Sequence, residues 1–184
     1  SIMFCSSGLT TPPALPATTM KKYCYCSMFE NTAITSVPEL PATNFQFANG
    51  CYRGLFKKCK NIVSVPSNLL QAEVINNACY QSMFSECSNL SNAPALPAKS
   101  LPNLCYNSMF YKSGIVNAPE IDAITLTTQD CCTGMFKDCS NLINAPSILR
   151  PSTLTNNCYK EMFMGCKNLQ NAPELPALEL ASEC

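Results

Sequence analysis

The fourteen cysteines are the residues of this sequence with the most chemistry open to them, because a thiolate can attack a substrate, bind a metal ion or form a disulfide. The chain contains no histidine, so no imidazole is present to act as the base that activates a nucleophilic cysteine. Zinc sites use cysteine pairs in close tandem, whereas the spacing here is C-x₇-C. We therefore expect no catalytic residue, no metal site and no cofactor.

Most of the cysteines fall in two columns of a repeated pattern, one just before a tyrosine and one in a later turn. The first column is Cys24, Cys51, Cys79, Cys105, Cys131, Cys158 and Cys184, and the second is Cys59, Cys87, Cys139 and Cys166. Cys5, Cys26 and Cys132 are off the pattern, and Cys132 stands where the tyrosine is expected.

Disulfides between repeats stay open as an alternative. Equivalent residues on adjacent strands lie about 4.8 Å apart, and a disulfide tolerates Cα separations of about 4.4–6.8 Å. A uniform ladder offers no unique partner, however, and a repeat core needs no cross-link. We favour buried, reduced thiols that pack as small hydrophobic side chains.

Seven Met-Phe or Leu-Phe pairs recur along the chain and define a repeat. They are Met3-Phe4, Met28-Phe29, Leu55-Phe56, Met83-Phe84, Met109-Phe110, Met135-Phe136 and Met162-Phe163. Successive phenylalanines of these pairs are 25, 27, 28, 26, 26 and 27 residues apart. A period of about 20–29 residues is typical of leucine-rich repeats.

Each unit reads approximately C-Y-x-x-M-F-x-x-C-x-N-L-x-x-A-P-x-L-P-A-x-x-L. Cys, Met and Phe would share one face of a short helix or 3₁₀ turn, and Asn or Asp before the cysteine, as at Asp130 and Asn157, fits a helix start. The prolines exclude helix from the second half and favour an extended backbone. We predict an α/β repeat solenoid, a right-handed leucine-rich-repeat coil with one short strand and one short helix or 3₁₀ turn per repeat of about 26 residues.

Aliphatic columns at a constant phase predict one continuous core. The first holds Leu9, Ile34, Ile62, Leu90, Ile115, Leu142 and Leu169, the second Leu15, Leu40, Leu96, Ile121, Ile148 and Leu175, and the third Met20, Leu101, Leu126, Leu154 and Leu180. A polar column includes Asn92, Asn117, Asn144 and Asn171, which we interpret as a ladder that satisfies backbone groups.

Composition excludes several functions. Twelve basic and twelve acidic residues cancel, which argues against nucleic acid as a partner. No run of about 18 apolar residues exists, so we expect no membrane insertion by this segment. The cluster Lys57, Lys58 and Lys60 is best interpreted as a solvated loop. Without histidine, a matched carboxylate pair or a glycine-rich phosphate loop, we expect no enzyme.

The chain begins and stops inside a repeat, without polar capping segments. Repeat arrays need atypical terminal repeats to cover the core. We therefore expect residues 1–184 to form a single domain of about six to seven repeats that belongs to a longer protein.

The segment Phe163-Met164-Gly165-Cys166-Lys167-Asn168-Leu169, like Phe84–Leu90 and Phe136–Leu142, resembles the A-F-x-G-C-x-x-L core of BspA-type leucine-rich repeats. The Met-Phe-x-x-Cys form is also similar to the 26-residue repeat of bacterial surface proteins. This resemblance covers nearly the whole chain. It implies an exported protein of the bacterial cell surface that adheres to host or bacterial partners. The segment Ala-Pro-x-Leu-Pro-Ala departs from the family, which usually has a β-branched strand there.

We predict a non-catalytic surface that binds a protein or a glycan, with a structural spacer or stalk as the alternative. Variable, strand-flanking residues are the first candidate contacts: Thr10, Thr35, Ser91, Gln170, Glu39, Glu120 and Glu174. The second is a stripe of tyrosines: Tyr25, Tyr52, Tyr80, Tyr106 and Tyr159. We expect these rings to be partly buried with the hydroxyl at the surface, and an exposed stripe would be suited to stacking on sugars.

Overall fold

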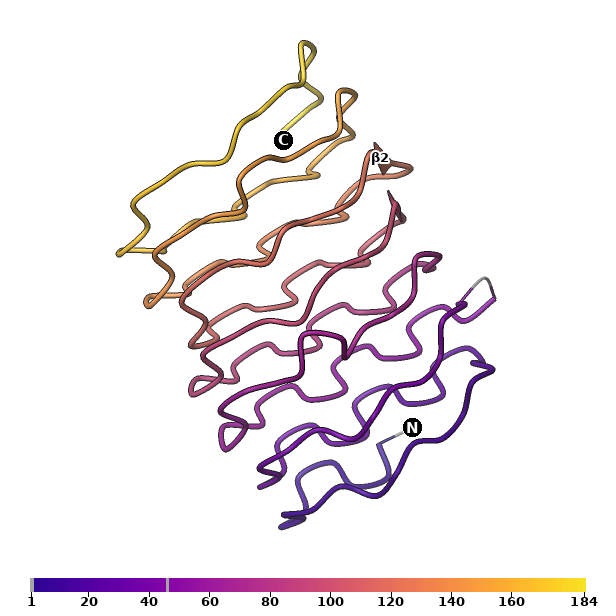
Figure 1. The fold of residues 1–184 in the computed structure, drawn as a ribbon. Helices are drawn as coiled ribbons and strands as arrows, with labels where there is room; N and C mark the ends of the chain where they lie inside the picture. The colour runs from indigo at the N-terminus through magenta and orange to yellow at the C-terminus, as the bar shows by residue number, and fades with distance from the viewer. Residues whose placement is uncertain (1, 46) are drawn as a thin grey trace.

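The computed structural model describes residues 2–45 and 47–184. Successive sequence repeats lie side by side, with the two chain ends at opposite ends of the stack (Figure 1). We call the part of the chain from one Met-Phe or Leu-Phe pair to the next a layer. Backbone hydrogen bonds join each layer to its neighbour, as between Phe56 N–H and the carbonyl of Met83, 3.0 Å away.

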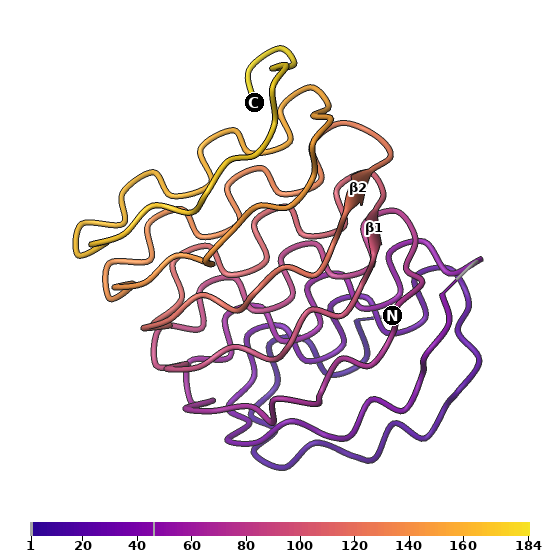
Figure 2. The same ribbon diagram turned by 45° about the horizontal axis from the view of Figure 1, so that its top comes forward.

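The predicted fold class, an α/β leucine-rich-repeat solenoid, is wrong. The described residues contain no helix, and their strands are β1 (Ser100–Leu101) and β2 (Thr125–Leu126). These two form one small parallel sheet, with Ser100 paired to Thr125 and Leu101 to Leu126 (Figure 2).

Elsewhere in residues 2–45 and 47–184, the extended segments of neighbouring layers meet at isolated bridges, such as the one between Leu96 and Ile121. Prolines explain why no strand per repeat forms. The extended segment of each layer carries prolines, such as Pro94 and Pro97, which have no N–H group to donate to a sheet.

The first half of each repeat folds into a ribbon of overlapping turns. We call these segments the turn ribbons: residues 23–31, 50–58, 78–86, 104–112, 130–138 and 157–165. Within the ribbon 50–58, Arg53 N–H donates to the Gly50 carbonyl and closes a turn, whereas Gly54 N–H donates to Gln81 of the next layer. These two kinds of bond alternate along the ribbon. A 3₁₀ helix would direct every N–H to the third preceding residue, so the predicted helical turn is replaced by a different structure.

Every fourth residue of a turn ribbon has a left-handed backbone. In the ribbon 50–58 these residues are Gly50, Gly54 and Lys58, with φ of 61°, 60° and 62°. A helix cannot continue through such a residue, because it needs consecutive right-handed conformations. Asp130 and Asn157 take this left-handed conformation instead of starting a helix, and both residue types tolerate it better than most.

Side chains of the ribbon point in and out in pairs, which explains the C-Y-x-x-M-F-x-x-C pattern. Cys51-Tyr52 and Leu55-Phe56 are buried, while Arg53 between them is exposed. The phenylalanines of the seven Met-Phe or Leu-Phe pairs stack along the molecule, with ring centroids 5.5–5.9 Å apart. Beside them, the first aliphatic column is fully buried from Ile34 to Leu142, so the predicted core is confirmed there.

One glycine marks a close approach between layers. A Cβ atom added at Gly114 would lie 2.3 Å from the Ser88 carbonyl oxygen. The substitution Gly114→Ala should therefore lower the free energy of unfolding by about 1–3 kcal/mol, because backbone must move. Gly8→Ala is the control, since nothing lies within 4 Å of its added Cβ, and it should change stability by less than about 0.5 kcal/mol. Urea unfolding followed by tyrosine fluorescence measures both, and equal stability of the two variants would contradict the close approach.

Candidate functional site

The seven polar and acidic residues that we predicted to contact a ligand are all exposed: Thr10, Thr35, Ser91, Gln170, Glu39, Glu120 and Glu174. They lie on the extended segments, and backbone hydrogen bonds align them across layers. Thr35 N–H donates to the Thr10 carbonyl at 3.3 Å, and Gln170 N–H donates to the Ile143 carbonyl at 2.9 Å. These bonds align Thr10 with Thr35, and a second run of them joins Val63, Ser91, Val116, Ile143 and Gln170 into a row.

Two adjoining hollows lie between the proline-rich segments of the first three layers. One, of about 370 Å³, is lined by the hydroxyl residues Thr11 and Ser36 among prolines. The other, of about 250 Å³, includes Asn68 and Gln71. Glu39 lines both, so one exposed carboxylate stands between the two hollows.

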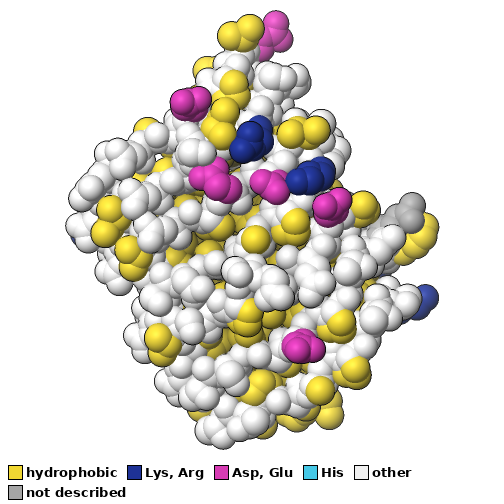
Figure 3. All heavy atoms as spheres, in the orientation of Figure 1, with side chains coloured by type: hydrophobic (Ala, Val, Ile, Leu, Met, Phe, Trp, Pro, Cys, Tyr) yellow, Lys and Arg dark blue, Asp and Glu magenta, His cyan; other side chains and the backbone are white. Residues whose placement is uncertain are grey.

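Sequence reasoning missed these hollows, although the prolines were a usable signal. A proline has no N–H group, so neighbouring extended segments cannot be joined there by a continuous row of hydrogen bonds. Space is left between them. On the face drawn in Figure 3, hydrophobic side chains are exposed between backbone atoms and uncharged side chains of other types.

The three glutamates that we predicted to contact a ligand differ in the contacts they make within the molecule. Glu120 accepts hydrogen bonds from the Ser147 N–H at 2.8 Å and from the Ser147 hydroxyl at 2.9 Å. Its carboxylate therefore links two layers. Glu39 borders the hollows, and Glu174 lies in the last layer, where its N–H donates to the Ser147 carbonyl at 2.9 Å.

The asparagine column joins layers through side-chain hydrogen bonds. Asn144 Nδ2 donates to Asn117 Oδ1 at 2.7 Å, and Asn171 Nδ2 donates to Asn144 Oδ1 at 3.2 Å. Asn92 bonds both backbone groups of Val65, at 2.9 Å to N–H and 2.8 Å to C=O. Amides can donate and accept at once, which is what such a ladder requires.

The tyrosine stripe is a core feature along most of its length. Rings of Tyr25, Tyr52, Tyr80 and Tyr106 stack with centroids 6.0–6.1 Å apart, and Phe45 packs edge-on against the second and third of these rings. Tyr52, Tyr80 and Tyr106 are fully buried.

The hydroxyls of Tyr52 and Tyr106 are buried without a hydrogen-bond partner in residues 2–45 and 47–184. The expectation that the hydroxyls reach the surface is therefore wrong for these two. Tyr25 and Tyr159, at the ends of the stripe, are half-buried. The buried rings of Tyr52, Tyr80 and Tyr106 are not available to stack on a sugar.

All fourteen cysteines are free thiols. In the first column, Cys51, Cys79, Cys105, Cys131 and Cys158 are buried, whereas Cys24 is half-buried.

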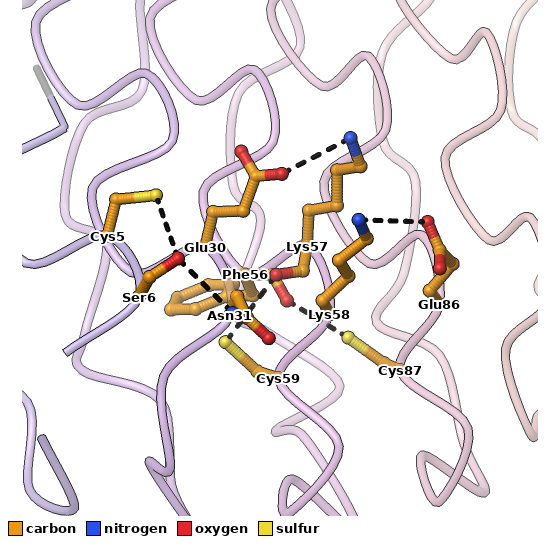
Figure 4. Close-up of polar contacts among 10 residues, drawn as sticks. All are labelled: Cys5, Ser6, Glu30, Asn31, Phe56, Lys57, Lys58, Cys59, Glu86 and Cys87. Carbon is orange, nitrogen blue, oxygen red and sulfur yellow. Dashed lines mark hydrogen bonds and ion pairs between the residues drawn. The ribbon is translucent and has the colours of Figure 1, made fainter. Parts of the chain in front are cut away.

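The second column has a defined role that the sequence did not reveal. Each of its thiols donates to the carbonyl of the phenylalanine in the preceding layer, as Cys87 does to Phe56 at 3.1 Å (Figure 4). Such S–H donors are weak and add a second hydrogen bond to the carbonyl, because the Phe56 carbonyl also accepts from Cys59 N–H at 3.0 Å.

Cys131 and Cys132 form a buried thiol pair. A hydrogen bond to Cys131, with burial as the second cause, raises the pKa of Cys132 well above its ordinary value. The same hydrogen bond lowers the pKa of Cys131. Both sulfurs lie in the core, out of reach of a substrate.

The lysine cluster belongs to a row of ion pairs between layers. Lys57 Nζ lies 3.2 Å from a carboxylate oxygen of Glu30, and Lys58 Nζ lies 4.0 Å from one of Glu86 (Figure 4). Solvent-accessible pairs of this kind stabilise a protein by about 0–1 kcal/mol. Lys57 and Lys58 thus have partners within the molecule.

No helix of the described residues is long and apolar enough to cross a membrane. The chain matches no family model, no curated protein and no solved structure. Its function must therefore be inferred from the arrangement of its own residues.

The Tyr106 hydroxyl is buried without a hydrogen-bond partner among residues 2–45 and 47–184, so its removal should not destabilise the protein. Tyr106→Phe should leave the free energy of unfolding unchanged or raise it by up to about 1–3 kcal/mol, because a buried hydroxyl without a partner is destabilising. Tyr25→Phe, at a half-buried ring of the same stripe, is the control and should change little. Urea denaturation compares the two. A clear loss of stability in Tyr106→Phe alone would mean that this hydroxyl has a partner in solution.

Buried thiols predict a loss of stability in alkali. Burial raises the pKa of Cys139 from an ordinary 9.0 to about 11. Between these pH values the unfolded chain loses the thiol proton while the folded protein keeps it. The contribution of this thiol to the free energy of unfolding is therefore intact below pH 9 and is lost as pH rises toward 11. The urea midpoint should fall across this window. The midpoint of Cys139→Ser should fall less steeply, because serine has no thiol to ionise in this range. Ser113, which contacts Cys139 Sγ from the preceding layer, indicates that a serine is tolerated in this part of the core. A midpoint of the native protein that does not depend on pH would contradict the raised pKa of Cys139.

Proposed function

We propose that this protein is a non-catalytic module of a cell surface that recognises a protein or a glycan on a host or bacterial partner. The observation that carries the proposal is the pair of adjoining hollows with Glu39 between them. Their walls combine rigid prolines with the hydroxyls of Thr11 and Ser36.

These walls suit a ligand with hydroxyl or cationic groups. The Glu39 carboxylate accepts hydrogen bonds from sugar hydroxyls or from a lysine or arginine of a peptide, and charge-assisted bonds are the stronger ones. Prolines present a preformed apolar surface, so little conformational freedom is lost on binding. The likeness of the repeat motif to BspA-type and 26-residue-repeat surface proteins supports the same proposal and adds export to the surface of a bacterium.

A structural spacer is the second candidate, and a specific observation favours it. The asparagine ladder, most of the tyrosine stripe and the second cysteine column hold neighbouring layers together. Repeated side chains are thus used largely for cohesion. The row of exposed residues and the two hollows are what distinguish a binding surface from a spacer.

Binding of the folded protein to a glycan array and to immobilised matrix proteins tests the proposal. Glu39→Gln should weaken a saturable interaction about tenfold or more, since a hydrogen bond to a charged group contributes about 1.5–3 kcal/mol. Glu73→Gln is the matched control, because Glu73 is exposed but lines neither hollow, and it should bind as the native protein does. Equal weakening in both variants would place the binding surface elsewhere, and no binding to any probe would favour the spacer.

A further inference from the structure

The polar column that forms the asparagine ladder changes beside the two hollows. From Asn92 onward its amides join neighbouring layers, as Asn144 Nδ2 does by donating to Asn117 Oδ1 at 2.7 Å. In the first three layers the residues of this column are exposed and carry hydroxyls instead: Thr11, Ser36 and Ser64. These hydroxyls have no hydrogen-bond partner among residues 2–45 and 47–184. The hollows therefore lie where this column leaves polar groups free.

The backbone beside the larger hollow is rich in free acceptors. Residues 11–16 have six carbonyls but three N–H groups, because three of the six residues are prolines, and residues 36–41 contain two more prolines. The backbone groups of both segments form no hydrogen bond with another described residue. In a later layer, by contrast, Ala118 N–H donates to the Asn144 carbonyl at 2.9 Å. The larger hollow thus suits a ligand that donates more hydrogen bonds than it accepts.

Glu39 adds a negative charge to these acceptors. Its exposed carboxylate lines both hollows and has no hydrogen-bond or ion-pair partner among residues 2–45 and 47–184. Elsewhere a carboxylate such as that of Glu30 is paired, with Lys57 Nζ at 3.2 Å. None of the described residues that line the two hollows is basic. A cationic group of a ligand would therefore meet this carboxylate without competition from the walls.

The walls give a sugar ring nothing to stack on. None of the described residues that line the hollows is aromatic, and the rings of Tyr52, Tyr80 and Tyr106 are buried in the core. Pro38 and Val37 instead provide apolar surface to both hollows. The aliphatic stem of an arginine or lysine packs along such surface while its charged end stays with polar groups.

The size of the hollows indicates a single side chain in each. Pockets for small-molecule ligands usually have volumes of about 300–1,000 Å³. The volumes here, about 370 Å³ and about 250 Å³, are near or below the lower end of that range. A side chain that projects from a protein partner therefore fits better than a larger free ligand.

Arginine matches the chemistry of the walls more closely than lysine does. A guanidinium carries five N–H donors and no acceptor, and it pairs with a carboxylate through two parallel hydrogen bonds. Its other N–H groups stay available for hydroxyls and carbonyls. The ammonium of lysine has three donors on a compact charge and cannot form this paired contact.

We propose that the hollows beside Glu39 bind an arginine side chain of a protein partner. The guanidinium pairs with the Glu39 carboxylate, its remaining N–H groups donate to the hydroxyls of Thr11 and Ser36 and to free backbone carbonyls, and its stem lies against the prolines. This inference rests on the recognition function proposed above and narrows the ligand from a protein or a glycan to an exposed arginine of a protein.

NMR titration of the folded protein with a synthetic pentapeptide, in which arginine stands between glycine and serine residues, tests the inference at millimolar concentrations. Binding should be saturable and should weaken as salt is added. The matched peptide with citrulline, which has a similar shape but no charge, should bind about tenfold or more weakly. A lysine peptide should also bind more weakly than the arginine peptide. Equal binding of the arginine peptide and either of the other two would overturn the assignment to a guanidinium.

Two variants locate the contact. Glu39→Gln should weaken binding of the arginine peptide about tenfold or more, whereas Glu73→Gln, at an exposed residue that lines neither hollow, should bind as the native protein does. Circular dichroism establishes that both variants keep the native fold. If the two variants bind the peptide equally, the arginine does not bind at Glu39 and the inference fails.

A glycan array separates this inference from the function on which it rests. Saturable glycan binding that Glu39→Gln removes, without any binding of the arginine peptide, would overturn the arginine ligand and leave the recognition function standing. Absence of binding to the peptide, to the array and to immobilised matrix proteins would overturn both.

Discussion

Along the turn ribbon 50–58, every second backbone N–H group donates to a carbonyl of the next layer, and the N–H groups between them close turns within the ribbon. In the ribbon 50–58 this division leaves each peptide group with a partner, either along the chain or across it. The division requires a left-handed residue at every fourth position, which is unfavourable for most residues other than glycine. Lys58 and Asp130 accept that conformation because the hydrogen bonds on both sides hold it in place.

The side chains follow from this backbone. A period of four residues turns Cys51-Tyr52 and Leu55-Phe56 inward together, and because neighbouring layers are in register, Tyr52 stacks on Tyr25 and Phe56 on Phe29. Stacked phenylalanines and tyrosines are the result, along with thiols that bond the carbonyls of the layer before. Cysteine and tyrosine, which can act in catalysis or binding in other proteins, hold neighbouring layers together here. The surface that remains for recognition is that of the extended segments.

The sequence predicts the repeat, its columns and the buried core, because these depend only on spacing. It does not predict the turn ribbons, since Cys79, Met83 and Cys87 at intervals of four suit one face of a helix as well. Gly50 and Asn157, just before the cysteine, are residue types that favour a left-handed backbone, but Tyr23, Ala78 and Leu104 stand at the same position and give no such sign. In the candidate site, the exposure of Glu39 was predictable from the sequence. The hollows beside it depend on the distance between proline-rich segments of neighbouring layers, and the spacing of residues along the sequence does not give that distance. The burial of Tyr106 depends likewise on the packing of whole layers.

The direction of the hydrogen bonds between turn ribbons has an electrostatic consequence. From Phe4 to Met28 and from Phe136 to Met162, the N–H group belongs to the earlier layer and the carbonyl to the later one. In an ordinary parallel sheet such dipoles alternate and nearly cancel, whereas here they add along one side of the molecule, as they do in a helix. That side therefore carries a macrodipole parallel to the stack, with its positive pole toward the later layers.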